Sequence, residues 1–153
     1  MPKFETIRQV RHSPEEMFAL VADVERYPEF LPMCERLVVR SRREREGITM
    51  IVADMTVGYK ALSETFTSQV VLRPDHNRID VRNVEGPFKR LENHWNFEPT
   101  PDGGTRVRFR IEYEFKSRLL ATIVGSMFDR AFRMFAEAFE KRADAVYGAA
   151  PAA

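Results

Sequence analysis

Hydrophobic residues recur at helical spacing near the end of the chain, from about Ser117 to Tyr147. At about 100° per residue they form one broad arc, with Phe132 at its edge and charged residues opposite. The arc comprises Leu120, Ile123, Val124, Met127, Phe128, Ala131, Met134, Phe135, Ala138 and Phe139. The pattern predicts a helix of roughly 27 residues, about 40 Å long. Because the arc is wide and charges interrupt it, we expect it to cover a broad surface rather than cross a membrane.

Strict alternation of apolar and polar residues predicts strands over most of the remaining chain. The clearest case runs from Arg106 to Lys116, where Val107, Phe109 and Ile111 point one way and charged residues the other. This is typical of an antiparallel sheet with one solvated face. The other predicted strands are Phe4–Val10, Leu37–Ser41, Ile48–Val57, Tyr59–Leu72, Ile79–Val84 and Leu91–Phe97. Short turns between them imply a twisted meander that curls around the long helix.

Short helices are expected between the first and second strands. Ser13-Pro14-Glu15-Glu16 carries an N-cap, a proline at the first helical position and acids in the first turn, so a helix should run from there to about Asp23. Tyr27–Cys34 holds two prolines and many apolar residues, which predicts a short helical turn with inward side chains. The charged segment Arg42–Gly47 is predicted as a hairpin turn. The fold class is therefore α+β, with about seven strands.

Length and composition describe a single domain. The chain has 153 residues, with 24 Lys and Arg against 23 Asp and Glu, so no global field would attract DNA. One cysteine, Cys34, excludes an internal disulfide. We expect a domain over residues 1–147, a disordered tail over 148–153, and a cytoplasmic protein because the N-terminus turns polar at once. Peripheral contact with a membrane stays open.

Few residues suggest chemistry. His12, His76 and His94 are scattered, and no zinc-protease, phosphate-loop or nucleophile motif is present. We therefore expect no catalytic residue, no metal and no catalytic cofactor. Glu64 shares the inward parity of its strand, which leaves two readings: a carboxylate near an open end, or a polar anchor or general acid. Asn93 raises the same choice.

The inward positions hold many large, flexible or aromatic side chains. Their presence fits either a plain core or a ligand cavity with adaptable walls. They are Met33, Met55, Phe66, Phe88, Trp95, Phe109, Phe115, Met127, Phe128, Met134 and Phe135. A separate basic cluster of Arg40, Arg42, Arg43 and Arg45 fits either a solvated face or a surface for RNA or anionic lipid.

Two motifs resemble a known family. Tyr27-Pro28-Glu29-Phe30-Leu31-Pro32-Met33-Cys34 and Gly86-Pro87-Phe88-Lys89-Arg90-Leu91, with Glu64–Ser68 and Trp95, are similar to the ubiquinone-binding START-domain family of the polyketide cyclase/START-like superfamily. The similarity extends from about Lys3 to Tyr147. It implies a helix-grip (START/Bet v 1-like) fold, in which a curved antiparallel sheet wraps around the C-terminal helix. The family also contains ribosome-association toxins of toxin–antitoxin systems.

The resemblance implies a hydrophobic tunnel between helix and sheet that binds ubiquinone and supports respiration. Phe30, Tyr59 and Asn93 then join the inward residues other than Phe115 as ligand contacts, with Trp95, Tyr59 or Asn93 facing the quinone ring. Tyr27–Met33 and Gly86–Phe88 are the expected lids. The first hypothesis is a non-enzymatic carrier of ubiquinone or a related isoprenoid lipid. The second is a toxin that binds the large ribosomal subunit, and the third is a cyclase or hydratase using Glu64.

Overall fold

The computed structural model describes residues 3–148 and confirms the α+β architecture. The expected disordered tail lies, apart from Gly148, outside the described residues. In chain order the elements are β1 (Lys3–Val10), α1 (Pro14–Ala22), the 3-10 helix η1 (Val24–Glu29), β2 (Cys34–Arg45), β3 (Ile48–Tyr59), β4 (Leu62–Arg73), the 3-10 helix η2 (Pro74–His76), β5 (Arg78–Glu85), β6 (Phe88–Pro99), β7 (Thr105–Phe115) and α2 (Arg118–Tyr147).

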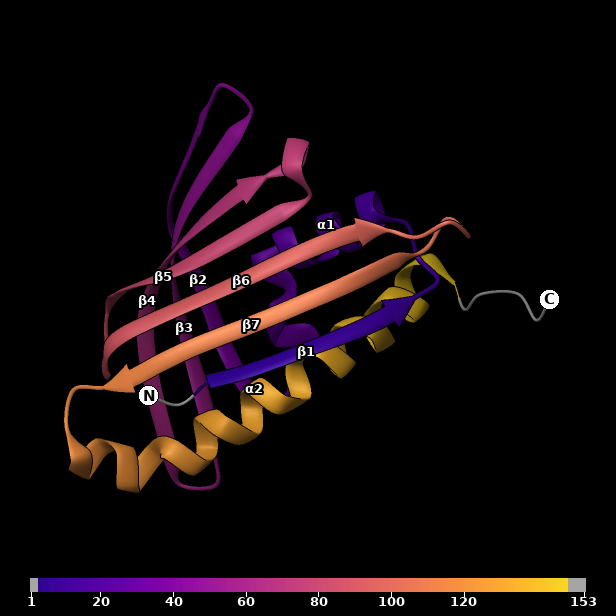
Figure 1. Cartoon of the computed structure of the whole chain (residues 1–153). Helices are drawn as coiled ribbons and strands as arrows, with labels where there is room; N and C mark the ends of the chain where they lie inside the picture. Colours follow the sequence, from indigo (N-terminus) through magenta and orange to yellow (C-terminus); the bar gives the residue numbers. More distant parts are fainter. Residues whose placement is uncertain (1–2, 149–153) are drawn as a thin grey trace.

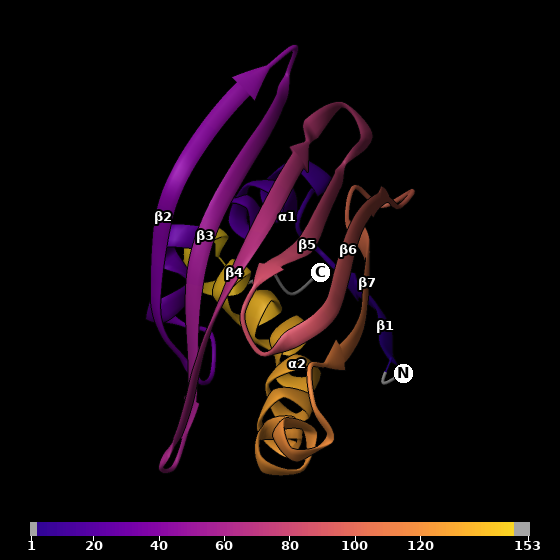
Figure 2. The same cartoon turned by 90° about the vertical axis from the view of Figure 1, so that its left-hand side faces the viewer.

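The seven strands form one antiparallel sheet in the order β1-β7-β6-β5-β4-β3-β2. The sheet curls, and α2 lies along its concave side together with α1 and η1 (Figures 1 and 2). The predicted meander is confirmed for β2 to β7. β1 pairs instead with β7 at the opposite edge, so α1 and η1 carry the chain from one edge of the sheet to the other.

Several strands extend further than the alternation predicts. β2 continues to Arg45 because Arg42–Arg45 pairs in register with Ile48–Ile51, so the hairpin turn is only Glu46-Gly47. Charged side chains can occupy both faces there, since this end of the hairpin is exposed. β6 begins at Phe88, three residues before the predicted start. The helical turn predicted over Tyr27–Cys34 forms earlier, as η1.

Both main helices begin at the predicted caps. The Ser13 hydroxyl accepts from the Glu16 amide at 3.1 Å while the Glu16 carboxylate accepts from the Ser13 amide at 3.0 Å, which is a capping box. The Ser117 hydroxyl accepts from the Leu120 amide at 3.1 Å and starts α2. Within residues 3–148, neither helix carries an apolar stretch long enough to span a bilayer.

The buried face of α2 differs from the predicted arc. Ile123 and Met134 are 46 % and 43 % exposed, whereas Phe132, assigned to the edge, is 3 % exposed. The helix is turned so that Phe132 packs against Tyr113 of β7, with ring centroids 5.2 Å apart. Apolar residues cover more of the helix than the sheet can bury, so packing against the aromatic strands selects which of them point inward.

An aromatic cluster at the centre of the core joins α2 to the sheet. The Phe88 ring lies 4.9 Å from Phe128, 5.5 Å from Phe66 and 5.0 Å from Phe115. Gly86, at φ +137°, precedes this cluster, and a Cβ there would lie 2.7 Å from the Phe66 Cβ. A glycine is therefore required for β5 and β6 to connect this close to the Phe66 side chain.

Replacing Phe128, which is fully buried, should show how much α2 depends on this cluster. We expect Phe128→Ala to lower the free energy of unfolding by about 3–5 kcal/mol because it leaves a cavity among rings. Met134→Ala should change it by about 0.5 kcal/mol or less, since that side chain lies at the surface and is 43 % exposed. Urea titration of both variants checks this, and equal losses would contradict the observed orientation of α2.

Candidate functional site

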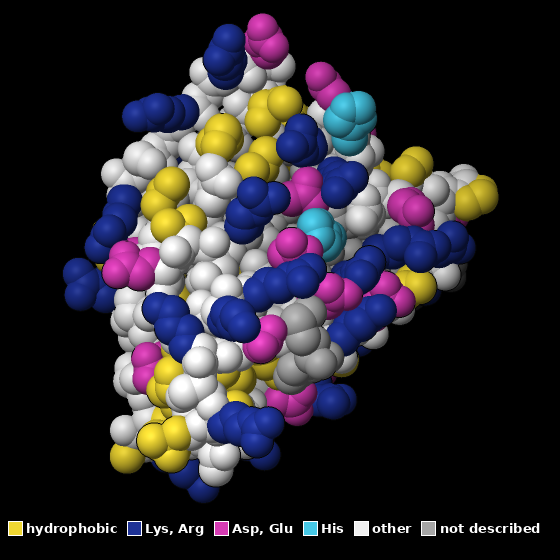
Figure 3. Space-filling model, turned by 60° about the vertical axis from the view of Figure 1, so that its left-hand side comes forward, with side chains coloured by type: hydrophobic (Ala, Val, Ile, Leu, Met, Phe, Trp, Pro, Cys, Tyr) yellow, Lys and Arg dark blue, Asp and Glu magenta, His cyan; other side chains and the backbone are white. Residues whose placement is uncertain are grey.

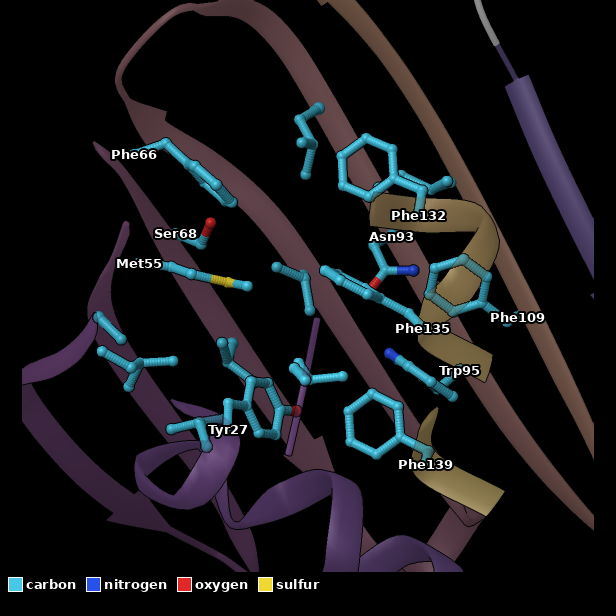
Figure 4. A pocket seen from close by; sticks show the side chains of 18 residues that line it. Tyr27, Met55, Phe66, Ser68, Asn93, Trp95, Phe109, Phe132, Phe135 and Phe139 are labelled. Atoms are coloured by element: carbon cyan, nitrogen blue, oxygen red, sulfur yellow. The ribbon is translucent and has the colours of Figure 1, made fainter. Parts of the chain in front are cut away.

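An apolar cavity of about 80 Å³ lies between the concave face of the sheet, α2 and η1 (Figure 4). Strands β2 to β7 form one wall, and Phe132, Phe135 and Phe139 of α2 form the other. Val24 and Tyr27 of η1, with Leu31, close the remaining side. Alternation along the strands brings these side chains together, because every second residue faces the helix.

Six of the residues predicted to contact a ligand line this cavity. They are Met55, Phe66, Asn93, Trp95, Phe109 and Phe135. They come from β3, β4, β6, β7 and α2, so the inward parity of separate strands correctly brought them to one place. Their side chains converge on the hollow in Figure 4.

The wall contains few polar side-chain atoms, and only some of them have a hydrogen-bond partner. The Asn93 amide nitrogen donates to the Arg110 carbonyl at 2.8 Å, which leaves the Asn93 Oδ1 as an acceptor at the cavity. The Ser68 hydroxyl is buried with no hydrogen-bond partner among the described residues. A buried hydroxyl without a partner is destabilising, so Ser68 offers an unused donor and acceptor.

Tyr27 and Trp95 lie at the η1 end of the cavity. The Tyr27 hydroxyl donates to the Val21 carbonyl, and burial raises its pKa well above the usual range, with the nearby Cys34 and Asp23 adding to the effect. Tyr27 therefore stays protonated. The nitrogen edge of the Trp95 ring is turned toward the interior of the cavity in Figure 4.

Three predicted residues lie in the core beside the cavity rather than on its wall. Phe88, Met127 and Phe128 are at most 1 % exposed, and the Phe66–Phe128 ring distance of 5.7 Å places the cavity next to their cluster. They close one end of it by packing.

Four other predicted contacts lie toward the surface. Phe30 packs on Phe139 at 5.2 Å and, with Met134, lines a surface groove. Met33 has a positive φ of 67°, and its carbonyl accepts from the Gly58 amide at 2.8 Å. The Tyr59 hydroxyl accepts from Arg130 at 2.8 Å, outside the cavity.

Glu64 has the inward parity but is not part of the cavity wall. It is half-buried and pairs with Val57 near the turn of the β3–β4 hairpin. No ionisable carboxylate lines the cavity among the described residues. Residues 3–148 also contain no group of three or more His, Cys, Asp or Glu side chains that could hold a metal ion.

Of the 18 residues of the wall, twelve were not predicted as ligand contacts, and four of these are instructive. Phe139 belonged to the predicted arc of the helix but was not assigned to a ligand, and Phe132 was placed at the edge. Ser68 shares the parity of Phe66, which was a usable signal. Tyr27 was expected in a lid, whereas its hydroxyl end reaches inside because it bonds to Val21.

The turn that closes the cavity is fastened to α2 by one arginine. The Arg142 guanidinium donates to the Glu29 carboxylate at 2.7 Å and lies 5.1 Å from the centre of the Phe30 ring. We call Glu29, Phe30 and Arg142 the latch. Cys34 is buried just after this turn, and burial raises the pKa of its thiol to about 11, which makes it a poor nucleophile at neutral pH.

The predicted basic cluster lies along exposed β2, but two of its charges are already paired. Arg40 contacts Asp54 at 2.6 Å and Arg42 contacts Glu25 at 3.3 Å. Arg43 and Arg45 have no carboxylate within 4 Å among the described residues, although Glu44 and Glu46 are their neighbours. Figure 3 shows basic and acidic side chains intermixed over this face of the molecule.

A curved sheet gripping a long helix over an apolar cavity defines a helix-grip protein for hydrophobic ligands. Residues 10–140 match the family described as polyketide cyclase / dehydrase and lipid transport, and the chain belongs to this family. The resemblance found in the sequence is thereby confirmed. A START superfamily protein from Mycobacterium smegmatis superimposes with a TM-score of 0.76 at 20 % identity, over 94 % of this chain and 98 % of the other.

Two groups of curated relatives cover most of the chain. The ribosome association toxin RatA of Vibrio cholerae is 38 % identical over 139 residues, which is 91 % of this chain and 93 % of the relative. The mitochondrial coenzyme Q-binding protein coq10 of Schizosaccharomyces pombe is 33 % identical over 131 residues, which is 78 % of this chain and 74 % of the relative. The coenzyme Q-binding relative carries the name expected under the first hypothesis, and the ribosome association toxin the name expected under the second.

The latch can be tested with Cys34 as a reporter, because it is the only cysteine of the chain. Arg142→Ala removes both the ion pair and the contact with Phe30, so the turn should open more often. We expect Cys34 to react with iodoacetamide about three to ten times faster at fixed pH, as loss of about 1 kcal/mol would produce.

Arg26→Ala is the matched control. Arg26 bonds to the same Glu29 at 3.2 Å and to Asp23 at 3.1 Å, but both contacts lie within η1. Its removal should leave the alkylation rate near that of the parent. If the two variants react alike, the latch does not hold the turn to α2.

Proposed function

We propose that this protein is a non-enzymatic carrier of ubiquinone or a related isoprenoid lipid. The observation that supports it best is the apolar cavity between α2 and the sheet, with aromatic and methionine walls and only a few polar atoms. An isoprenoid tail gains about 0.8 kcal/mol for each CH₂ removed from water, so such walls suit it. The coenzyme Q-binding relative adds independent support.

A quinone ring needs hydrogen-bond donors for its carbonyl oxygens. Tyr59 lies outside the cavity, and one N–H of the Asn93 amide donates to the Arg110 carbonyl, which leaves its second N–H for a ligand. The Ser68 hydroxyl and the Trp95 ring nitrogen are the further donors of the proposal, since both residues line the wall and the Ser68 hydroxyl has no partner.

Loading must enlarge the cavity. About 80 Å³ holds only two or three waters, whereas ligand pockets measure about 300–1,000 Å³. Met55 can change rotamer at low cost, and release of the latch would let Tyr27 and Phe30 move away from Phe139. We therefore propose that the ligand binds to an opened form.

The proposal includes neither catalysis nor a catalytic cofactor. A cyclase or hydratase would need an acid or base at the ligand, and Glu64 is not part of the wall. The protein would work in the cytoplasm, at the inner face of the cytoplasmic membrane, where an isoprenoid ligand is found.

The first test is organic extraction of the protein purified from a respiring host, followed by mass spectrometry for quinone. We expect quinone in the parent and its loss in Ala53→Leu. Ala53 is 4 % exposed and lines the cavity, so a larger apolar side chain occupies the ligand's space while the core stays apolar.

Ala19→Leu, on the exposed side of α1, adds the same atoms away from the cavity and should retain quinone. Thermal melting of both variants shows that they fold. A folded parent without any isoprenoid compound, or an Ala53→Leu variant loaded like the parent, would refute the carrier function.

The second candidate is association with the large ribosomal subunit, favoured by the RatA relatives. Arg43 and Arg45 are the exposed, unpaired charges of the β2–β3 hairpin, so changing both to Glu should remove co-sedimentation with ribosomes. Quinone content should not change, because Arg43 and Arg45 lie near the tip of this hairpin and neither lines the cavity. Sedimentation of the parent and the variant alike would exclude this surface.

A further inference from the structure

One end of the molecule combines exposed aliphatic side chains with unpaired basic residues. Leu119 and Ile123, one helical turn apart at the start of α2, are 69 % and 46 % exposed. The tip of the β3–β4 hairpin, Lys60-Ala61, is also exposed. Both segments project at the same end of the molecule in Figures 1 and 2, and the Arg130–Tyr59 hydrogen bond joins them.

The charge of this end is positive. Lys60, Lys116, Arg118 and Arg130 are exposed, and none has a carboxylate within 4 Å among the described residues. From Lys116 to Phe128 the chain contains no acidic residue. Of the acids on adjoining segments, Asp129 pairs with Arg133 at 3.0 Å and Glu114 with Lys89 at 3.9 Å, while Glu35, which accepts from the Ser63 hydroxyl at 3.3 Å, and Glu64 lie beside the hairpin tip and leave the basic residues in excess. Figure 3 shows hydrophobic and basic side chains together at its lower end.

We propose that this end, formed by the first turns of α2 and the β3–β4 tip, docks on an anionic lipid bilayer. Aliphatic side chains flanked by lysines and arginines are typical of surfaces that insert shallowly among acidic headgroups. A protein partner is less well matched, because stable interfaces bury about 800 Å² on each side and need a wider apolar centre. The proposal rests on the carrier function, since an isoprenoid ligand has to be exchanged at a membrane.

The position of this end also suits exchange of a ligand. The Gly58 amide, next to the tip of the hairpin, bonds to the carbonyl of Met33, so the hairpin is attached to the turn that closes the cavity. Docking through the hairpin would therefore act directly on that turn. Contact with a bilayer would thus be connected to the cavity through the hydrogen bond between Gly58 and Met33.

Co-sedimentation of the full chain with vesicles tests the proposal. We expect binding to vesicles of phosphatidylcholine with phosphatidylglycerol, weak binding to phosphatidylcholine alone, and loss of binding as salt screens the charges. Leu119→Ser/Ile123→Ser and, separately, Lys60→Glu/Arg118→Glu should each lower the bound fraction about tenfold.

Two matched controls use equally exposed residues elsewhere. Ile7→Ser changes an aliphatic side chain that is 51 % exposed on β1, and Arg43→Glu/Arg45→Glu changes two unpaired arginines on the other hairpin. Both should bind vesicles like the parent. Circular dichroism verifies the fold of every variant, and because the apolar and the basic variants are independent, one that misfolds leaves the other as the test.

The outcomes separate this proposal from the carrier function. Three results overturn the docking surface, even if the purified protein carries quinone. The parent does not bind vesicles, both docking variants bind them like the parent, or the controls lose binding as much as the docking variants do. If the parent binds vesicles as expected but carries no quinone, the docking surface is upheld and the carrier function is refuted. If the parent does not bind vesicles and the docking variants lose ribosome binding, the surface binds RNA and the proposal fails.

Discussion

The fold depends on covering one broad apolar face of α2 with a sheet that has to curl to reach it. Neither part is stable alone, because the helix would expose a row of phenylalanines and the sheet its whole concave side. Contacts such as Phe88 with Phe128 and Tyr113 with Phe132 bring the two together. The cavity lies where this contact is incomplete, between Phe135 and the strands around Asn93. The candidate binding site is thus a gap in the core, and its walls and the stabilising residues belong to the same set.

Polar contacts are distributed unevenly along α2. Its C-terminal half is fastened by Arg8 to Glu140 at 2.6 Å, by His12 to Asp144 at 2.7 Å and by the latch. Within residues 3–148, the N-terminal half is bonded to the sheet through Arg130 and Tyr59 alone, and otherwise relies largely on aromatic packing. Ring contacts tolerate sliding better than charged hydrogen bonds do. The helix is therefore anchored at one end and adaptable at the other, where the exposed leucine and isoleucine lie.

Most of the fold was predictable from the sequence, because a period of two along β7 and helical spacing along α2 are properties of the chain itself. The side of α2 that is buried was not, since Ile123, Met134 and Phe132 are all apolar and only the partner strands decide among them. For the site, parity correctly selected Met55, Phe66 and Trp95. It could not show that Glu64 lies beyond the wall, or that Asn93 uses its amide nitrogen on Arg110. Those outcomes depend on contacts between residues distant in sequence.

The small volume of the cavity has an energetic meaning for a carrier. In the unloaded protein, the side chains that would touch a ligand touch one another instead, as Tyr27 and Phe30 do with Phe139 at 5.2 Å. Collapse of the walls therefore competes with the ligand for the same surfaces, and part of the binding free energy is spent on reopening them. Such a protein would hold its ligand more weakly than a rigid pocket of equal area. It would also close behind a departing molecule, so that release is favoured without any energy-consuming step.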